Sequence, residues 1–316
     1  MPDTKTSPLP RSNAYSQVDN DLWMIYRKYR PKYPHSLFQR IYTYHIANGG
    51  SFDGTAHDAG CGPGITAEIL ALQFKHLICS DHSESAVAAA RDHLLGSNGR
   101  TANALFTFKV SSAEDMSWIE PGTIEMVTMS EALHWTDTAR TLEAAHRVLK
   151  SGGTFAAWYY TQPRFPDSPA IERLFRSLQG HWCKLRKDFS AESGRTLWIE
   201  QTGYDCIAFP KSQWVAVNRI KFNTGDDRDI WIRDDDLSGM RYDSRVAESE
   251  HLELIEDADW TQTIDLDWMR GWFQSLSPRV DQRRLLETLE QLEKALAPSG
   301  QSRAVWPVSL LLASKR

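Results

Sequence analysis

The sequence predicts an α/β protein built on a doubly wound, mostly parallel sheet, and three observations support this. Strand-like and helix-like segments alternate through the first half of the 316 residues, as in proteins whose parallel strands are joined by helical crossovers. A glycine-rich loop, Gly60 to Gly64, follows one such strand and opens a helix. Asp81 ends the next strand, about 20 residues past the first glycine, where a carboxylate can accept hydrogen bonds from a ribose.

Apolar spacing gives the expected bounds of each element in turn. Helices are expected at 36–47, 65–74, 84–95, 138–149 and 281–296, and strands at 55–59, 76–80, 105–110, 124–129, 154–159 and 306–313. Leu142, Ala145 and Val148 lie at helical spacing and predict a buried helix face, which is a structural role. Pro307 fits the last strand only at its start or at a sheet edge.

The glycine loop is the strongest indication of function. Gly60, Gly62 and Gly64 lack a Cβ atom, so the backbone there can approach a ligand closely, and the free N–H groups of the following helix face the same ligand. The spacing is G-x-G-x-G, whereas the dinucleotide fingerprint is G-x-G-x-x-G and cradles a pyrophosphate. The loop therefore predicts a nucleoside-like cofactor without requiring a phosphate. An ordinary turn is the alternative for an isolated glycine loop.

With the acid that precedes it, Asp58, this loop resembles the first motif of the class I S-adenosylmethionine-dependent methyltransferases. Three later segments resemble motifs of the same family, namely 111–115, 130–137 and 145–153. The resemblance implies a Rossmann-like, seven-stranded sheet with an inserted cap. It also implies S-adenosylmethionine as the cofactor and in-line transfer of its methyl group.

Within that class, the sequence is most similar to small-molecule methyltransferases of the trans-aconitate methyltransferase type. This likeness is carried by 29–34, 134–137 and 306–310, whereas 161–250 matches nothing in the family. It implies O-methylation of a carboxylate or a hydroxyl. Two alternatives remain open, a nicotinamide-dependent oxidoreductase, which the glycine spacing disfavours, and a member of the fold that binds the cofactor without methylating.

The candidate cofactor-binding residues come from the loop, from strand ends and from the family resemblance. They are Tyr29, Arg30, Asp58, Gly60, Gly62, Gly64, Asp81, His82, Ala113, Glu114 and Ser130. Asp81 is expected to accept the ribose hydroxyls, and Glu114 or Asp115 to receive the adenine amino group. An acid after a strand is also a common helix starter, so Glu114 has a structural alternative.

His134 and Trp135 are the candidate catalytic residues, because they follow the fourth strand and should lie beside the transferring methyl. The alternative is a core tryptophan with a histidine at a helix start. A carboxylate acceptor is already ionised and needs no base, and Arg30 or Lys32 would position it. A hydroxyl acceptor needs a base such as His134.

The chain is expected to divide into four parts. Residues 1–34 form an N-terminal arm or lid, 35–160 the cofactor-binding core, 161–250 a cap over the substrate, and 251–316 the remainder of the α/β domain. By resemblance, Tyr29 and Arg30 in the arm would hold the methionine carboxylate of the cofactor. A plain packing arm with exposed cations is the alternative.

Composition favours a cytoplasmic enzyme with a small-molecule substrate. Hydrophobic residues are 41%, yet no apolar run reaches 18 residues and the N-terminus lacks the apolar block of a signal peptide. A net charge of -5 argues against a nucleic-acid partner. Four irregularly spaced cysteines fit neither a zinc cluster nor a disulfide framework. No metal is expected, and Asp234 to Asp236 are interpreted as a solvated loop.

Overall fold

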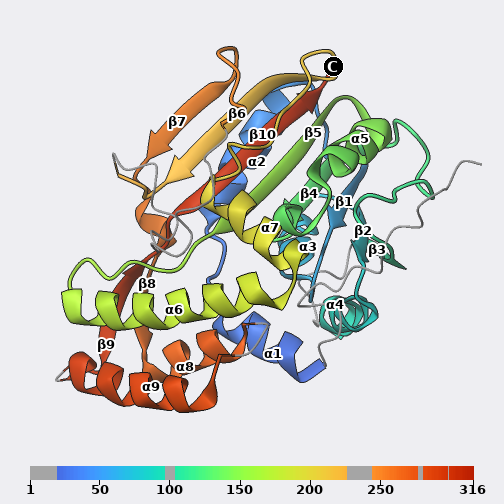
Figure 1. Ribbon diagram of the computed structural model, residues 1–316. Coiled ribbons are helices and arrows are strands. Elements are labelled where there is room, and N and C mark those ends of the chain that lie inside the picture. The colour runs from blue at the N-terminus through green and yellow to red at the C-terminus, as the bar shows by residue number, and fades with distance from the viewer. Residues whose placement is uncertain (1–19, 97–103, 226–243, 277–279, 298) are drawn as a thin grey trace, which may run out of the picture.

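A central eight-stranded sheet dominates the computed structural model, which describes residues 20–96, 104–225, 244–276, 280–297 and 299–316 (Figure 1). The strand order is β3-β2-β1-β4-β5-β10-β6-β7. The strands are β1 (Thr55–Ala59), β2 (His76–Asp81), β3 (Leu105–Val110), β4 (Ile124–Ser130), β5 (Leu149–Tyr160), β6 (Trp214–Phe222), β7 (His251–Ile255) and β10 (Val308–Lys315). Neighbours are parallel except where β10 pairs with β5 and β6. The prediction of a mostly parallel, doubly wound sheet is confirmed.

The sheet has eight strands where seven were expected. The strand order ends in β7, which pairs in parallel with β6, from Asn218 opposite His251 to Phe222 opposite Ile255. Its sequence, HLELI, alternates only weakly between polar and apolar residues, and these residues are half-buried or exposed. It therefore lacks the continuous apolar run of a central strand. This edge strand depends on pairing with β6 more than on its own pattern.

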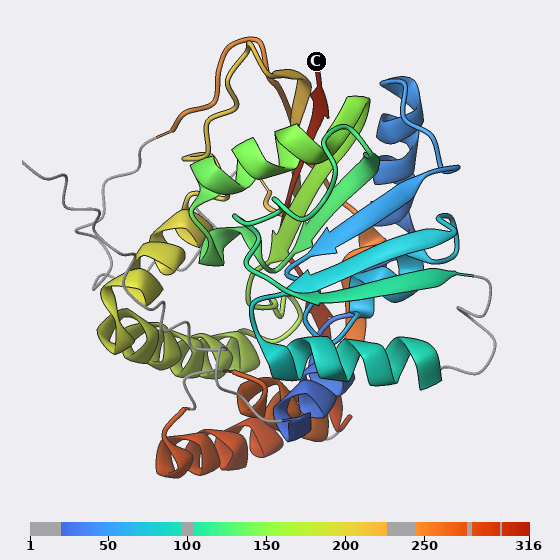
Figure 2. The same cartoon turned by 90° about the vertical axis from the view of Figure 1, so that its right-hand side faces the viewer.

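The two faces of the sheet bury alternate side chains of β5, as the period of a strand requires. Ala156 and Trp158 pack in the cluster that includes residues of helix α2 (His35–Ala47). Phe155 and Ala157 pack in the cluster that includes residues of α5 (Thr138–Val148). Figure 2 shows α2 and α5 on opposite sides of the strands.

The end of helix α3 and the start of strand β5 differ from the bounds expected from the sequence. Helix α3 (Ile65–Leu70) ends before the expected residue 74, because residues 71–73 form turns before β2. Helix α5 ends at Val148, and β5 begins at once at Leu149, five residues earlier than expected. Helix α4 (Glu84–Gly96) follows β2 as predicted. The 3₁₀ turn η1 (Leu133–Trp135) lies between β4 and α5.

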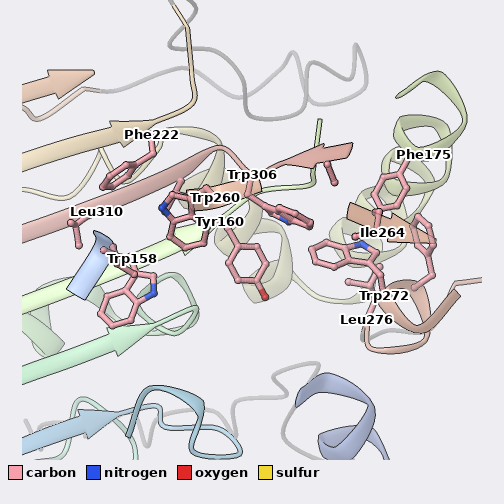
Figure 3. Packing of buried hydrophobic residues seen from close by; sticks show 14 of the residues in the cluster. Trp158, Tyr160, Phe175, Phe222, Trp260, Ile264, Trp272, Leu276, Trp306 and Leu310 are labelled. Carbon is pink, nitrogen blue, oxygen red and sulfur yellow. The ribbon is translucent and has the colours of Figure 1, made fainter. Parts of the chain in front are cut away.

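A helical lobe lies across the carboxyl edge of the parallel strands (Figure 1). Its helices are α1 (Asn20–Tyr29), α6 (Pro169–Phe189), α7 (Ala191–Gln201), α8 (Leu266–Gln274) and α9 (Gln282–Leu296), beside a two-stranded sheet of β8 (Thr261–Asp265) and β9 (Gln301–Val305). The turn η3 (Ala258–Trp260) precedes β8. Figure 3 shows Phe175 of α6 and Trp272 of α8 in one apolar cluster with Trp158 and Tyr160 of the sheet.

The four expected parts interleave in the folded chain. In the arm, α1 packs against α4 and α8 with Leu22 and Trp23 buried, because an amphipathic helix covers its apolar face. The segment 161–250 supplies not only α6 and α7 but also β6, which lies inside the sheet between β10 and β7. Residues 1–19 and the acidic run Asp234 to Asp236 lie outside the described residues.

Candidate active site

A cavity of about 360 Å³ lies between the carboxyl edge of the sheet and the helical lobe. The loop after β1 and the ends of β2, β4 and β5 form one wall, with Gly62, Asp81 and Ser130 among its residues. Helices α1, α6, α7 and α8 form the other wall. Segments from the whole chain therefore meet where open α/β sheets bind ligands.

The glycine loop reaches the cavity through backbone conformations that glycine adopts easily. Gly60 and Gly62 have φ angles of 72° and 50°, and both line the cavity. A Cβ atom on Gly60 would lie 2.6 Å from the Cβ of Ala132, whereas one on Gly62 would come no closer than 3.9 Å to the ring of Trp23. Gly64 is the N-cap of α3 and does not line the cavity.

Asp81 connects the end of β2 to that loop. Its Oδ2 atom accepts a hydrogen bond from the Gly62 amide at 3.0 Å, and Oδ1 accepts one from the Ser83 amide at 2.9 Å. The Nδ1 atom of His82 lies 3.1 Å from Oδ1. Burial lowers the pKa of His82, but the hydrogen bond and charge of Asp81 outweigh it, so the pKa is raised overall. Asp81 is thus an oriented carboxylate on the cavity wall.

The segment after β3 contributes two of the predicted residues, Ala113 and Glu114, to the same wall. Glu114 Oε1 accepts a hydrogen bond from the Asp137 amide at 2.7 Å, so this carboxylate also supports the start of α5. Asp115 instead bonds Ser117 and does not line the cavity. Of the two acids weighed for the adenine amino group, the fold brings Glu114 to the site.

Two other candidates lie outside the cavity lining. Asp58 is fully buried, and its Oδ1 atom accepts a hydrogen bond from Thr128 Oγ1 at 2.8 Å, which joins β1 to β4. Burial raises the pKa of Asp58 to about 7. Tyr29 donates from its hydroxyl to Asp267 Oδ2 on α8 at 2.9 Å. In this structure both side chains make contacts within the protein.

Arg30 and Tyr33, by contrast, line the cavity. The Arg30 guanidinium donates from Nε to Ser275 Oγ at 2.8 Å and lies over the rings of Tyr26 and Trp272. The hydroxyl groups of Tyr33 and Ser130 are 2.5 Å apart. The segment after α1 therefore connects the helical lobe to the end of β4.

His134 belongs to a buried polar network. Its Nδ1 atom is 2.9 Å from Tyr204 Oη, and its Nε2 atom is 2.7 Å from Glu200 Oε1. Burial lowers the pKa of His134. Glu200 also accepts two hydrogen bonds from Arg186, whose guanidinium lies 4.2 Å from the ring centroid of Trp135. Both ring nitrogens of His134 are engaged within the protein, although His134 and Trp135 line the cavity.

Several residues of the lining escaped the sequence analysis. Among them are Trp23, Tyr26, Glu131, Tyr159, Tyr160, Gln162, Gln179, Trp182, Arg186, Glu192, Glu200, Gln201, Trp272 and Leu276, together with Tyr33, which lies inside the motif 29–34. Glu131 lies inside a segment already identified, so its position after β4 was a usable signal. Trp182 and Arg186 share an i,i+4 helix face, but nothing in the local sequence indicates what that face contacts.

The described part of the chain offers no support for a metal site or a membrane span. There, no group of three or more His, Cys, Asp or Glu side chains is arranged to hold a metal ion. No helix of that same part combines the length and apolar character needed to cross a membrane.

Comparison with known proteins identifies the family. A methyltransferase domain family matches residues 57–157. A methyltransferase of Claviceps purpurea is 38% identical over 308 residues, covering 96% of this chain and 95% of that protein. The methyltransferase AacuQ of Aspergillus aculeatus is 37% identical over 305 residues, with 93% of each covered. A solved structure from Anaeromyxobacter dehalogenans, assigned as a type II methyltransferase, superposes with a TM-score of 0.57 and covers 90% of this chain and 97% of that one. The sequence identity is 19%, so this similarity concerns the fold. The chain belongs to the class I S-adenosylmethionine-dependent methyltransferases.

Proposed function

We propose that this enzyme binds S-adenosylmethionine in the cavity and transfers its methyl group to a carboxylate or hydroxyl oxygen of a small molecule. The observation that carries the proposal is that the glycine loop and Asp81 share one cavity with an aromatic wall from the helical lobe. A methyl donor on the first wall would face an acceptor on the second.

The residues on the sheet side suit the parts of S-adenosylmethionine. Asp81 supplies a carboxylate for the ribose hydroxyls, and Glu114 an acceptor for the adenine amino group. At Gly62 the bare backbone faces the cavity, with no protein atom close to where a Cβ would stand. When bound, the cofactor supplies an activated methyl group on a sulfonium. The protein's part is then to align the acceptor and to exclude water.

The helical side suits a small acceptor with an apolar body. Trp182 of α6 and Trp272 of α8 line the cavity, as do Tyr33 and Leu276, and Arg30 is a cation in the same wall. Arg30 would orient an anionic group of the acceptor, as the likeness to trans-aconitate methyltransferases also suggests. That subfamily and a cytoplasmic location are part of the proposal, the latter because all four cysteines are free.

Two measurements test this function. Calorimetry should detect binding of S-adenosylhomocysteine, and mass spectrometry with isotopically labelled S-adenosylmethionine should find the label in a panel of carboxylic acids and phenols. Membership of a methyltransferase family argues against the oxidoreductase alternative. Tight cofactor binding with no transfer to any acceptor would instead favour a member of the fold that does not methylate.

A further inference from the structure

We propose that Glu131 is the general base of this enzyme and that the acceptor is a hydroxyl group on a planar aromatic ring. The inference rests on the proposed methyl transfer and selects one of its two acceptor classes. It depends on the position of Glu131, on the charged and polar groups around it, and on the aromatic side chains that line the cavity.

Glu131 immediately follows β4 and lines the cavity, next to Ser130 and to the loop of Gly60. Its φ angle is 53°, the left-handed region that non-glycine residues rarely adopt. Its amide donates to the Trp158 carbonyl at 2.9 Å, which holds this conformation against β5. Strained backbone maintained by its surroundings is concentrated at functional sites, where it directs a side chain toward a ligand.

The carboxyl group of Glu131 is held at one end. Oε1 accepts a hydrogen bond from the Tyr160 amide at 2.6 Å, and among the described residues this is the one donor to the group. The side chain is therefore oriented by one oxygen, while the other is available to a ligand in the cavity. A base needs this combination of fixed direction and an available lone pair.

The surroundings of Glu131 bring the pKa of its carboxyl group close to neutral pH. The pKa of Glu131 is raised to about 8, mainly by burial and in lesser part by the charge of Glu200, which together outweigh the lowering effects of the Tyr160 hydrogen bond, Arg30 and Arg186. Four tyrosines also face this group and interact with it, namely Tyr33, Tyr159, Tyr160 and Tyr204, each with its own pKa raised well above the usual value. A base whose pKa lies near the working pH is the most effective kind.

His134, the base expected from the sequence, is less suited to that role. Its two ring nitrogens are already bonded to Tyr204 and Glu200, and burial lowers its pKa. To accept a proton from a ligand it would have to break one of these bonds. We infer that His134 is a positioning residue, which holds Glu200 beside Arg186.

The aromatic lining of the cavity favours a flat, apolar acceptor. Tyr160 and Trp272, both labelled in Figure 3, have ring centroids 6.0 Å apart, and both line the cavity together with Trp182 and Leu276. Aromatic rings pack best against other rings, in offset or edge-to-face arrangements. Such a wall offers a planar ring more contact than it offers a short aliphatic acid.

The proposed step is balanced within the site. The acceptor hydroxyl transfers its proton to Glu131, and the oxygen left behind uses its electron pair to form the new O–CH₃ bond. The pair of the broken S–C bond remains on sulfur, giving S-adenosylhomocysteine and an aryl methyl ether. Glu131 then releases its proton to solvent.

Two matched phenols test the role of Glu131. 1-Naphthol needs a base at neutral pH, whereas 4-nitro-1-naphthol is the same ring with a hydroxyl acidic enough to be ionised already. Glu131→Gln should lower kcat/KM for 1-naphthol by about 10²-fold or more but for 4-nitro-1-naphthol by less than about tenfold. For 1-naphthol, the wild-type rate should rise with pH and level off above about 8, whereas the rate of the variant should keep rising as the naphthol itself ionises.

Glu125→Gln is the control variant. Glu125 is a buried carboxylate near the opposite end of β4, paired with Lys150 and absent from the cavity lining. It should keep the wild-type pH profile. Calorimetry of S-adenosylhomocysteine and tryptophan fluorescence with 1-naphthol give binding measurements that do not depend on turnover.

Specific results would overturn the inference. Equal losses for both naphthols at every pH would make Glu131 a structural residue. 1-Naphthoic acid, which carries a carboxyl group on the same ring system, is tested beside the two naphthols. Transfer to this acid alone, or no fluorescence response to any of the three compounds, would reject the phenolic, aromatic acceptor. Absence of S-adenosylhomocysteine binding by the wild-type enzyme would refute the proposed function itself, which is a separate outcome.

Discussion

The Gly62 amide and the Asp81 carboxylate are joined by a hydrogen bond of 3.0 Å, which connects the loop after β1 to the end of β2. The same carboxylate accepts a hydrogen bond from the Ser83 amide, so Asp81 holds two loops in place at the carboxyl edge of the sheet. A residue that both shapes the loop and faces the cavity affects ligand binding in two ways, by its own contacts and by the position of the backbone beside it.

Asp81→Ala should weaken the binding of S-adenosylhomocysteine by roughly 1.5–3 kcal/mol, the cost of losing charged hydrogen bonds. Calorimetry measures this directly. Asp92→Asn, an exposed position on α4, is the control and should bind normally. Unchanged affinity in Asp81→Ala, with a large fall in melting temperature, would make Asp81 purely structural.

The two loop glycines should respond differently to substitution. Gly62→Val puts a branched side chain into the cavity with no protein atom closer than 3.9 Å to its Cβ, so ligand affinity should fall more than tenfold, about 1.4 kcal/mol, in addition to a loss of stability from the strained φ of 50°. Gly60→Ala forces a Cβ to 2.6 Å from Ala132 and should mainly lower the melting temperature. Calorimetry with thermal denaturation separates the effects, and a folded Gly62→Val protein with normal affinity would contradict the assignment.

Removing Glu200 should be strongly destabilising, because it leaves Arg186 without its buried anion. We expect Glu200→Ala to lower the free energy of unfolding by about 3–5 kcal/mol in urea denaturation. The pKa of Glu200 is lowered to about 2 from its usual 4.5, since Arg186 and His134 outweigh the opposing effect of burial. The stability that Glu200 adds should thus be present above pH 4.5 and be lost as pH falls toward 2. A loss under 1 kcal/mol would show that the network is dispensable.

The contribution of Glu131 to stability should depend on pH in the opposite direction to that of Glu200. Its pKa is raised to about 8 from 4.5, so between these values the folded state holds a proton that the unfolded state has released, and stability falls as pH rises. Glu131→Gln removes this effect, so its melting temperature should rise relative to wild type between pH 5 and pH 8. Parallel melting curves across that range would contradict the raised pKa.

The segment after α1 should respond to ligand. We expect the backbone amides of 29–33 to exchange slowly only when S-adenosylhomocysteine is present, because this segment carries Arg30 and Tyr33 to the cavity. Hydrogen exchange followed by mass spectrometry measures it. The α2 peptide 37–45, which is largely buried, is the internal control. Equal and high protection of 29–33 in both states would make it ordinary packing.

Local sequence patterns were sufficient to predict the part of the cavity that the sheet and the glycine loop form. The alternation of strands and helices predicted the parallel sheet, and the loop with Asp81 predicted the edge at which the cavity lies. These features are encoded in short segments, since period, glycine spacing and strand ends act over a few residues. The same local signals could not distinguish Asp58, which bonds Thr128 inside the sheet, from a residue that faces ligand.

The substrate half depends on contacts between segments far apart in the chain. Arg186 meets Glu200 and Trp135, and Tyr33 meets Ser130, across separations that no local pattern records. The sequence by itself determined the α/β class, the glycine loop and its acid, because each depends on near neighbours. Only the tertiary structure decided that α6, α7 and α8 close the cavity and that Glu131 faces it, because burial and charge at a site depend on everything that packs around it.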